Sequence, residues 1–174
     1  MERAETACVP TLCQNEAGKK RLGDTGGGQA VILYLDASAL VKCYVEEQGS
    51  HDVVRLIQAS EIAGTGVLSR AEVVAAIARA TRIGSISRED GELAIAAFEA
   101  DWANLVRLQT TEAIIAQAAR LAWQKGLRGY DAVHLACTMT WRDALQRPVT
   151  MVTYDRELWQ GAQEEGLDLF PHEW

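Results

Sequence analysis

Short apolar runs alternate with longer segments of helical apolar spacing from about residue 31 to the end of the chain. The runs at 31–35 and 149–153 have the length and composition of buried strands. The segments between such runs repeat their apolar residues with the period of a helix, as in 69–83. Strands that alternate with helices are typical of parallel sheets, whose neighbouring strands need a crossover connection. The sequence therefore predicts an α/β fold with a parallel sheet.

Turn and capping residues divide this pattern into separate elements. The expected strands are 31–35, 62–67, 105–108, 149–153 and, at an edge, 167–170. The expected helices are 37–45, 51–59, 69–83, 87–100, 111–124, 130–141 and 156–165. Glycine follows several of these helices, as expected at a helix end. The pattern has no internal repeat and leaves no room for a second domain.

The first 29 residues do not share the pattern. They are polar and rich in glycine, and they end in three consecutive glycines at 26–28. Such composition does not form a packed core. We expect residues 1–29 to be either a disordered leader or the product of a start codon placed too early. The folded domain is then expected to span 30–174.

Composition limits where the protein is expected to work. No apolar run approaches the roughly 20 residues that cross a membrane, and the N-terminus lacks the apolar core of a signal peptide. Of the four cysteines, Cys43 and Cys137 lie in apolar segments and are interpreted as small buried hydrophobes. Cys8 and Cys13 have no neighbouring ligands that would complete a zinc site. We expect a cytoplasmic protein without a membrane partner.

Four acidic residues stand at the ends of strands or the starts of helices. Asp36 follows the strand at 31–35 and Asp155 follows the strand at 149–153, whereas Glu72 and Asp131 open helical segments. Open α/β folds place their sites at the carboxyl edge of the sheet, where such positions meet. Carboxylates gathered there repel one another unless a hard divalent cation binds between them. The pattern indicates a metal-dependent hydrolase that acts on a phosphodiester.

Each acid also has a purely structural interpretation. Asp36, Asp131 and Asp155 stand where an N-cap is favoured, and Ser69 with Glu72 forms a capping-box pattern. His134, on an otherwise apolar helix, is interpreted as a core histidine, because hard cations prefer oxygen ligands. The functional interpretation therefore depends on all four acids together.

The chain from about residue 31 to 174 resembles the PIN-domain ribonucleases, and most closely the VapC-type toxins of bacterial toxin–antitoxin pairs. The resemblance rests on four short motifs, which are 36–42, 69–72, 130–136 and 153–155. It implies a three-layer α/β/α sandwich around a mostly parallel sheet, and endonucleolytic cleavage of RNA that depends on Mg²⁺ or Mn²⁺. The acidic quartet of the family is matched by Asp36, Glu72, Asp131 and Asp155.

The expected roles follow from the chemistry of the residues and from this resemblance. Asp36, Asp131 and Asp155 are the predicted metal ligands, and Glu72 is expected to orient or deprotonate the attacking water or to help hold a second ion. Ser38 and Thr153 are expected to hold the acids in place, Thr153 as the hydroxyl-bearing neighbour in the family pattern. Three arginines are candidate phosphate contacts or solvated charges, namely Arg70, Arg79 and Arg128. The net charge of −7 argues against tight nonspecific binding of nucleic acid, but not against cleavage.

The resemblance also implies protein partners. These are a second copy of the chain and a small cognate antitoxin, whose C-terminal segment would cover the acidic site. Trp123, Trp141 and Trp159 are either interface or core residues. Two other functions stay open at this point. One is a catalytically inactive PIN-like module that binds RNA or protein and uses its acids as helix caps. The other is a different phosphoesterase or a phospho-receiver.

Overall fold

A computed structural model describes residues 31–174. The predicted leader at 1–29, with Cys8 and Cys13, lies outside the described residues. Five strands form one sheet in the order β3-β2-β1-β4-β5, and every neighbouring pair is parallel. They are β1 Ile32–Leu35, β2 Ile62–Gly66, β3 Val106–Leu108, β4 Thr150–Val152 and β5 Asp168–Phe170. The predicted parallel sheet is confirmed, and each expected strand is present.

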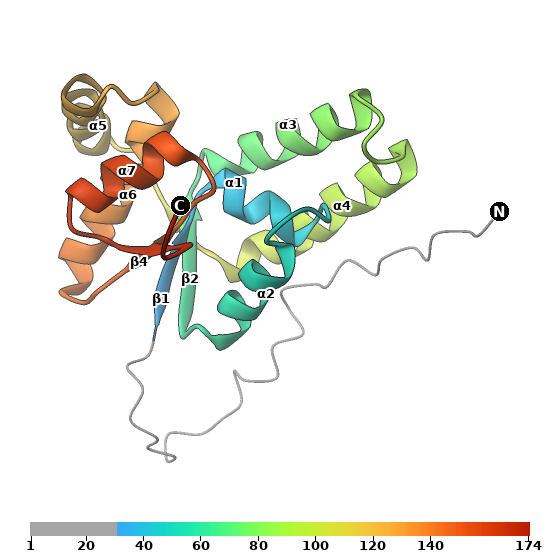
Figure 1. The fold of residues 1–174 in the computed structure, drawn as a ribbon, viewed down its shortest axis with the longest axis horizontal. Helices are drawn as coiled ribbons and strands as arrows, with labels where there is room; N and C mark the ends of the chain where they lie inside the picture. The colour runs from blue at the N-terminus through green and yellow to red at the C-terminus, as the bar shows by residue number, and fades with distance from the viewer. Residues whose placement is uncertain (1–30) are drawn as a thin grey trace, which may run out of the picture.

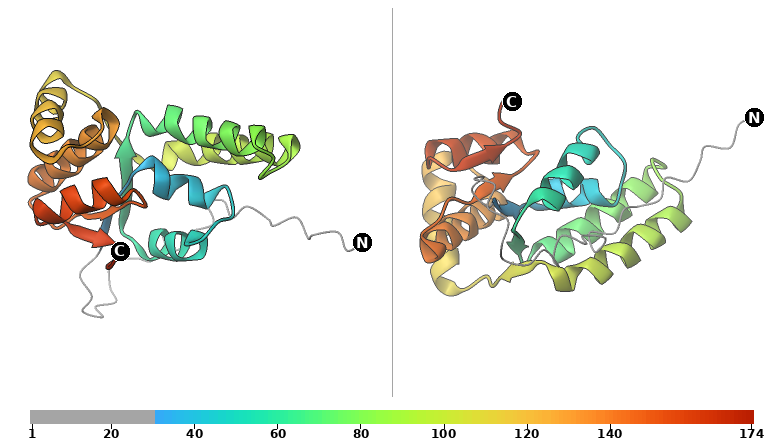
Figure 2. Two further views of the ribbon diagram at one scale, coloured as in Figure 1. Left: turned by 45° about the horizontal axis from the view of Figure 1, so that its top comes forward. Right: turned by 90° about the horizontal axis from the view of Figure 1, so that it is seen from below.

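Helices cover both faces of the sheet (Figures 1 and 2). One layer contains α1 Ala37–Leu40, the 3₁₀ helix η3 Val41–Cys43, α2 Ser50–Ala59, α3 Ser69–Arg82, α4 Arg88–Asp101 and the 3₁₀ helix η4 Trp102–Asn104. The other layer contains α5 Glu112–Lys125, α6 Gly129–Leu145 and α7 Arg156–Glu164. Since helices pack on both sides of one sheet, the fold is the predicted three-layer α/β/α sandwich.

The central strand β1 shows why two layers are needed. All four of its residues are buried, and successive side chains of a strand point to opposite faces. Ile32 and Tyr34 pack in the core beneath α5, α6 and α7, whereas Leu33 and Leu35 pack in the core beneath α1 to α4. A strand that is apolar at every position is therefore satisfied only when both faces of the sheet are covered.

Two helices differ from the predicted boundaries. The segment expected as one helix at 37–45 is α-helical only to Leu40 and then tightens into η3. The last helix before β4, expected at 130–141, continues to Leu145, because Leu145 still packs against the core of that layer. It stops at Gln146, which adopts a left-handed conformation with φ of 51°. Both differences lie at element ends, where local sequence signals are weakest.

Sheet order decides which strand ends meet. The chain runs outward from β1 through β2 to β3, then returns to the other side of β1 to form β4 and β5. The direction of winding therefore reverses between β1 and β4, and α/β sheets bind ligands at such a point beside the strands' carboxyl ends. Leu35 pairs with Val152 at this end of the two strands, and the backbone N–H of Asp36 donates to Val152 at 3.2 Å. Asp36 and Thr153 are thus neighbours in space.

Two other expectations concern the described residues. Cys43 and Cys137 are buried free thiols, as their apolar surroundings predicted. Burial raises the pKa of the Cys43 thiol to about 12 and that of Cys137 to about 11. Within residues 31–174, no helix is both long enough and apolar enough to cross a membrane.

Candidate active site

Asp36 is buried at the junction of β1 and α1, with an exposed fraction of 4%. One carboxylate oxygen, Oδ1, accepts from the backbone N–H of Ala39 at 2.9 Å and from the hydroxyl of Ser38 at 2.7 Å. The other, Oδ2, accepts from the Thr153 hydroxyl at 2.8 Å. The residue is therefore the N-cap of α1, as its structural interpretation predicted. Burial raises the pKa of Asp36, and its hydrogen bonds with Ser38, Ala39 and Thr153 oppose that rise.

Asp131 lies in the first turn of α6 but does not cap it. The N-cap position is occupied by Arg128, and that helix start has no side-chain cap. The Oδ2 atom of Asp131 is buried and has no hydrogen-bond partner among residues 31–174. Burial, and then the charge of Asp155, raise the pKa of Asp131 to about 6. A buried polar atom without a partner is uncommon and calls for a ligand or another cause.

Asp155 and Glu157 bring two more carboxylates to Asp131. One ligand oxygen from each of the three residues lies within 4.8 Å of the others. Asp155 caps α7, because its Oδ1 atom accepts a hydrogen bond from the backbone N–H of Leu158 at 3.0 Å. Glu157 is exposed in the first turn of α7 and lies 3.9 Å from Arg128 in an ion pair. This set is called the acidic cluster below.

The predicted acids are only partly gathered by this geometry. Asp131 and Asp155 belong to the acidic cluster. Asp36 does not, and its carboxylate is instead held by hydrogen bonds from Ser38, Ala39 and Thr153, a set called the Asp36 niche below. The charge of Asp36 nevertheless contributes to the raised pKa of Asp131, so the two carboxyls interact. The Thr153 hydroxyl joins the two regions, because it donates to Asp36 and accepts from the backbone N–H of Asp155 at 3.1 Å. Glu157 was missed in the sequence, where its only signal is an acid two residues after Asp155.

Glu72 does not form the predicted capping box. The N-cap of α3 is Leu68, and the hydroxyl of Ser69 is buried and bonded to Thr65 Oγ1 at 2.7 Å. The Glu72 side chain instead meets His134, with 3.0 Å between Oε2 and Nε2. His134 is buried, as the core interpretation predicted, but its bond to Glu72 was not foreseen. The capping interpretation of Glu72 is therefore wrong.

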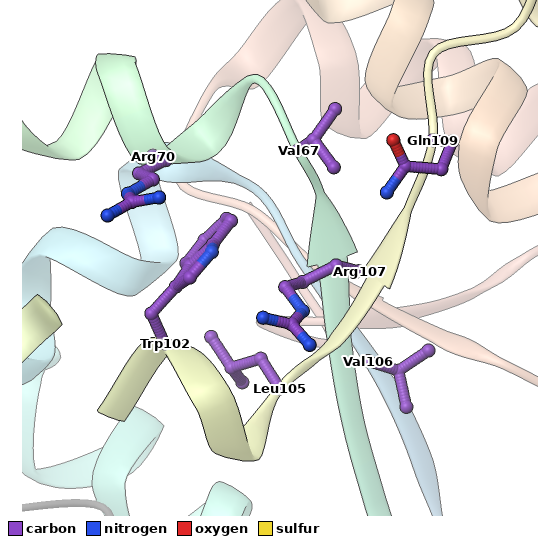
Figure 3. A pocket seen from close by; sticks show the side chains of 7 residues that line it. All are labelled: Val67, Arg70, Trp102, Leu105, Val106, Arg107 and Gln109. Carbon is purple, nitrogen blue, oxygen red and sulfur yellow. The ribbon is translucent and has the colours of Figure 1, made fainter. Parts of the chain in front are cut away.

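The candidate phosphate contacts occupy different places. Arg128 lies beside the acidic cluster through its ion pair with Glu157, and Arg79 lies exposed in the last turn of α3. Arg70 pairs with Glu99 and lines a pocket of about 560 Å³ at the β3 edge of the sheet. Figure 3 shows this edge pocket, whose lining residues are Val67, Arg70, Trp102, Leu105, Val106, Arg107 and Gln109.

Two residues that line the edge pocket lie at the carboxyl end of the sheet, where the acidic cluster also lies. Val67 directly follows β2 and Gln109 directly follows β3, so both stand at carboxyl ends of strands. In Figure 3 the guanidinium of Arg107 extends toward Trp102 and Leu105, on the side where Arg70 also lies. Neither Arg107 nor Gln109 was singled out in the sequence, because nothing local marks them as pocket residues.

Comparison with curated proteins finds close relatives over most of the chain. Ribonuclease VapC45 of Mycobacterium tuberculosis strain CDC 1551 / Oshkosh is 32% identical over 140 residues, which covers 80% of this chain and 95% of the relative. Ribonuclease VapC49 of Mycobacterium tuberculosis strain ATCC 25618 / H37Rv matches with the same identity and coverage. Both therefore align with nearly their whole length.

Solved structures share the fold at lower identity. PAE2754 from Pyrobaculum aerophilum matches with a TM-score of 0.57 and 20% identity, covering 84% of this chain and 88% of that one. VapBC2 from Rickettsia felis, bound to a DNA fragment from its promoter, matches with a TM-score of 0.55 and 12% identity, covering 80% and 97%. FitAcB from Neisseria gonorrhoeae matches with a TM-score of 0.55 and 15% identity, covering 80% of this chain and 96% of that one.

The family model of the PIN domain matches residues 33–161. That range runs from β1 into α7, so it includes all four predicted acids and Glu157. The family match therefore covers most of the sandwich and the carboxyl edge of the sheet. The chain therefore belongs to the PIN-domain family and is a VapC-type member of it.

Proposed function

We propose that the protein is a metal-dependent endoribonuclease and the toxin of a toxin–antitoxin pair. The observation that carries the proposal is the buried, unpaired Oδ2 of Asp131 beside the carboxylates of Asp155 and Glu157. Such an arrangement is unfavourable in the free protein, since like charges converge and a polar atom lacks a partner. A bound cation relieves both costs. The names of the two mycobacterial relatives support ribonuclease activity.

The donor set suits a hard divalent cation. All the groups that converge on the site are carboxylate oxygens, the ligands preferred by Mg²⁺ and Mn²⁺. Asp131 and Asp155 would hold the ion directly, and Glu157 would join them or stay paired with Arg128. Asp36 already accepts hydrogen bonds on both oxygens. Its negative charge would therefore attract the ion from a distance, or a water molecule would bridge the carboxylate and the ion. Mg²⁺ usually keeps several waters and uses only one or two protein carboxylates, which fits this division.

The proposed reaction is hydrolysis of an RNA phosphodiester. A bound cation would polarise the scissile phosphate and lower the pKa of a coordinated water. Glu72, whose carboxylate faces α6, would accept the proton of the attacking water. Ser38 and Thr153 would keep Asp36 in one rotamer behind the cluster. Arg128, beside the acidic cluster, would meet a phosphate oxygen. The product ends would be a 5′-phosphate and a 3′-hydroxyl.

Removal of divalent metal tests the proposal directly. Purified protein is expected to cleave RNA with Mg²⁺ or Mn²⁺, to stop in EDTA, and to recover when metal is restored. The same ions are expected to raise Tm, because a ligand that binds only the folded state stabilises it by mass action. RNA cleavage is read on a gel and Tm by calorimetry. Unchanged cleavage in EDTA, with the metal shown to be removed, would contradict the metal dependence.

A second function is favoured by the helix-capping hydrogen bonds of two of the acids. Asp36 and Asp155 both accept backbone hydrogen bonds at helix starts, as expected if they serve only the fold. The protein would then be a catalytically inactive PIN-like module that binds RNA or protein. This alternative leaves the unpaired oxygen of Asp131 unexplained. It predicts no cleavage and no rise of Tm with metal.

The proposed partners are a cognate antitoxin and a second copy of the chain. VapBC2 and FitAcB are similar in fold, and the VapBC2 structure includes DNA from the promoter of that pair. Trp141 and Trp159 are core residues, whereas Trp123 on α5 is 90% exposed. Tryptophan is enriched at protein interfaces relative to the rest of the protein surface. We propose α5 as part of the dimer contact, and Trp123→Lys with a mass measurement in solution tests it.

The edge pocket is proposed to hold RNA next to the cleaved bond. Arg107→Ala is expected to raise KM for RNA roughly threefold to tenfold, as for a lost phosphate contact worth about 1 kcal/mol, with little change in kcat. The plot of log binding constant against log salt concentration should also become less steep by about one unit of slope. Arg120→Ala, which removes an exposed arginine from α5, is the matched control. Equal effects of the two substitutions would show that the pocket has no special role.

A further inference from the structure

Three polar side chains form a buried chain of hydrogen bonds between the sheet, α6 and α3. The Tyr34 hydroxyl lies 2.8 Å from Nδ1 of His134, and Nε2 of His134 lies 3.0 Å from Oε2 of Glu72. Tyr34 has no exposed surface and His134 is only 2% exposed. Glu72, at the other end, is partly exposed. The chain therefore leads from the centre of the fold to the proposed proton acceptor.

The two hydrogen bonds together indicate which nitrogen of His134 carries the proton. A carboxylate only accepts hydrogen bonds, whereas a neutral tyrosine hydroxyl can donate one or accept one. A neutral imidazole has one donor and one acceptor nitrogen, so both contacts are satisfied when the proton is on Nε2 and the Tyr34 hydroxyl donates to Nδ1. The Nε2–H group faces the Glu72 carboxylate, which accepts it.

Packing holds His134 in this orientation. The rings of Tyr34 and His134 meet edge to face with centroids 5.8 Å apart, and the rings of Tyr34 and Trp141 also meet edge to face, with centroids 6.5 Å apart. Gly66 leaves room for the hydroxyl, since a Cβ at that position would lie 3.0 Å from it. The imidazole therefore cannot turn away without breaking both hydrogen bonds and disturbing the core.

His134 also connects Glu72 to the helix that carries Asp131. The two residues are three apart on α6, so they lie on one face of that helix. Glu72 comes from α3, so this hydrogen bond joins two helices through residues that are 62 positions apart in the sequence. A free glutamate has several rotamers, and fixing one of them improves the geometry of proton transfer. The hydrogen bond from His134 selects the rotamer in which the Glu72 carboxylate faces α6.

From this geometry we infer that His134, held in its Nε2–H form by Tyr34, is a positioning residue that orients Glu72 for its role in RNA cleavage. The inference rests on the proposed function for the role of Glu72, although the orientation itself does not. His134 touches neither substrate nor metal in this scheme. Its effect on the reaction is carried entirely by the Glu72 carboxylate.

Substitutions at His134 separate positioning from structural support. His134→Leu is expected to lower kcat about tenfold to a hundredfold with little change in KM, the size of effect typical of lost supporting contacts. His134→Gln places an amide N–H near the former Nε2 and is expected to restore most of the activity. Thr138→Val removes another buried hydrogen bond on α6, from the Thr138 hydroxyl to the His134 carbonyl at 2.9 Å. This control is expected to leave kcat unchanged.

A double-mutant cycle tests whether His134 acts through Glu72. In the Glu72→Gln background, His134→Leu is expected to cause no further loss of kcat, because the group that it orients is already inactive. An additive loss would overturn the inference. So would a His134→Gln variant that is as inactive as His134→Leu while both melt at the wild-type temperature.

Nitrogen-15 NMR of the histidine rings gives a readout that does not depend on activity. The wild-type spectrum is expected to show His134 protonated at Nε2 and unprotonated at Nδ1. Tyr34→Phe is expected to change that pattern, because the donor to Nδ1 is lost. An Nδ1–H form or a doubly protonated ring in the wild type would overturn the inference. If the wild type fails to cleave RNA but shows the expected tautomer, the proposed function fails and the orientation of Glu72 stands.

Discussion

Asp131→Asn is expected to abolish RNA cleavage and to stabilise the metal-free protein. Cleavage should fall by on the order of a thousandfold, since a catalytic cation contributes several kcal/mol to transition-state stability. Stability in EDTA should rise by about 1 kcal/mol, or roughly 2–4 °C in Tm, because the negative charge that Asp155 repels is removed. A residue that lowers stability while it enables activity is typical of a functional site.

The measurement is a pair of melting curves for each protein, with EDTA and with Mn²⁺. Wild type is expected to gain stability from the metal and Asp131→Asn to lose most of that gain. Asp143→Asn is the matched control, because Asp143 lies on the same helix but is exposed and paired with Arg142. A variant that keeps full cleavage, or that melts lower than wild type in EDTA, would contradict the role assigned to Asp131.

The pH dependence of the metal-free protein follows from the same carboxyl. Its pKa is raised to about 6 by burial and by Asp155, above the value of about 3.9 expected in the unfolded chain. Between these values the folded state binds more protons than the unfolded state, so stability falls as pH rises through this window. The contribution of this group is complete below about pH 4 and lost above about pH 6. Asp131→Asn is expected to flatten this part of the stability curve.

Asp36→Ala is expected to have the opposite effect on stability. The substitution leaves the hydroxyls of Ser38 and Thr153 and the backbone N–H of Ala39 without their acceptor, in a site that is almost fully buried. Breaking such a network by removing one partner costs about 3 kcal/mol or more, equivalent to roughly 6–12 °C in Tm. RNA cleavage is expected to be lost as well, because Thr153 also positions the backbone of Asp155.

Calorimetry of Asp36→Ala and Asp36→Asn distinguishes the two duties of this residue. The asparagine retains one acceptor oxygen and should recover part of the stability, but not the negative charge that cleavage requires. Asp52→Ala is the control for loss of an exposed helix-start acid, which pairs on the surface with Arg55. An Asp36→Ala protein as stable as wild type would show that the niche adds nothing to the fold.

Opposite stability changes at two acids of one site would separate the functional and structural interpretations. In the sequence these interpretations look alike, because any acid at a helix start satisfies the rules for a cap. In the structure both carboxylate oxygens of Asp36 accept hydrogen bonds, whereas the buried Oδ2 of Asp131 accepts none within residues 31–174. The two acids differ because a hydrogen-bond donor from a distant element, the Thr153 hydroxyl, reaches Asp36. The spacing of residues around each acid in the sequence does not predict such a contact.

Sequence alone determined the alternation of strands and helices, and with it the acids that follow β1 and β4, because apolar periodicity and helix capping are local properties. It also placed Asp131 and Glu72 in first turns of helices. Only the tertiary structure decided that Glu72 meets His134 across 62 residues, and that His134 meets Tyr34 across 100. Only the packing of α7 against α6 brought Glu157 to Asp131. Such contacts join surfaces that become neighbours after the sheet has assembled, so they depend on the fold as a whole.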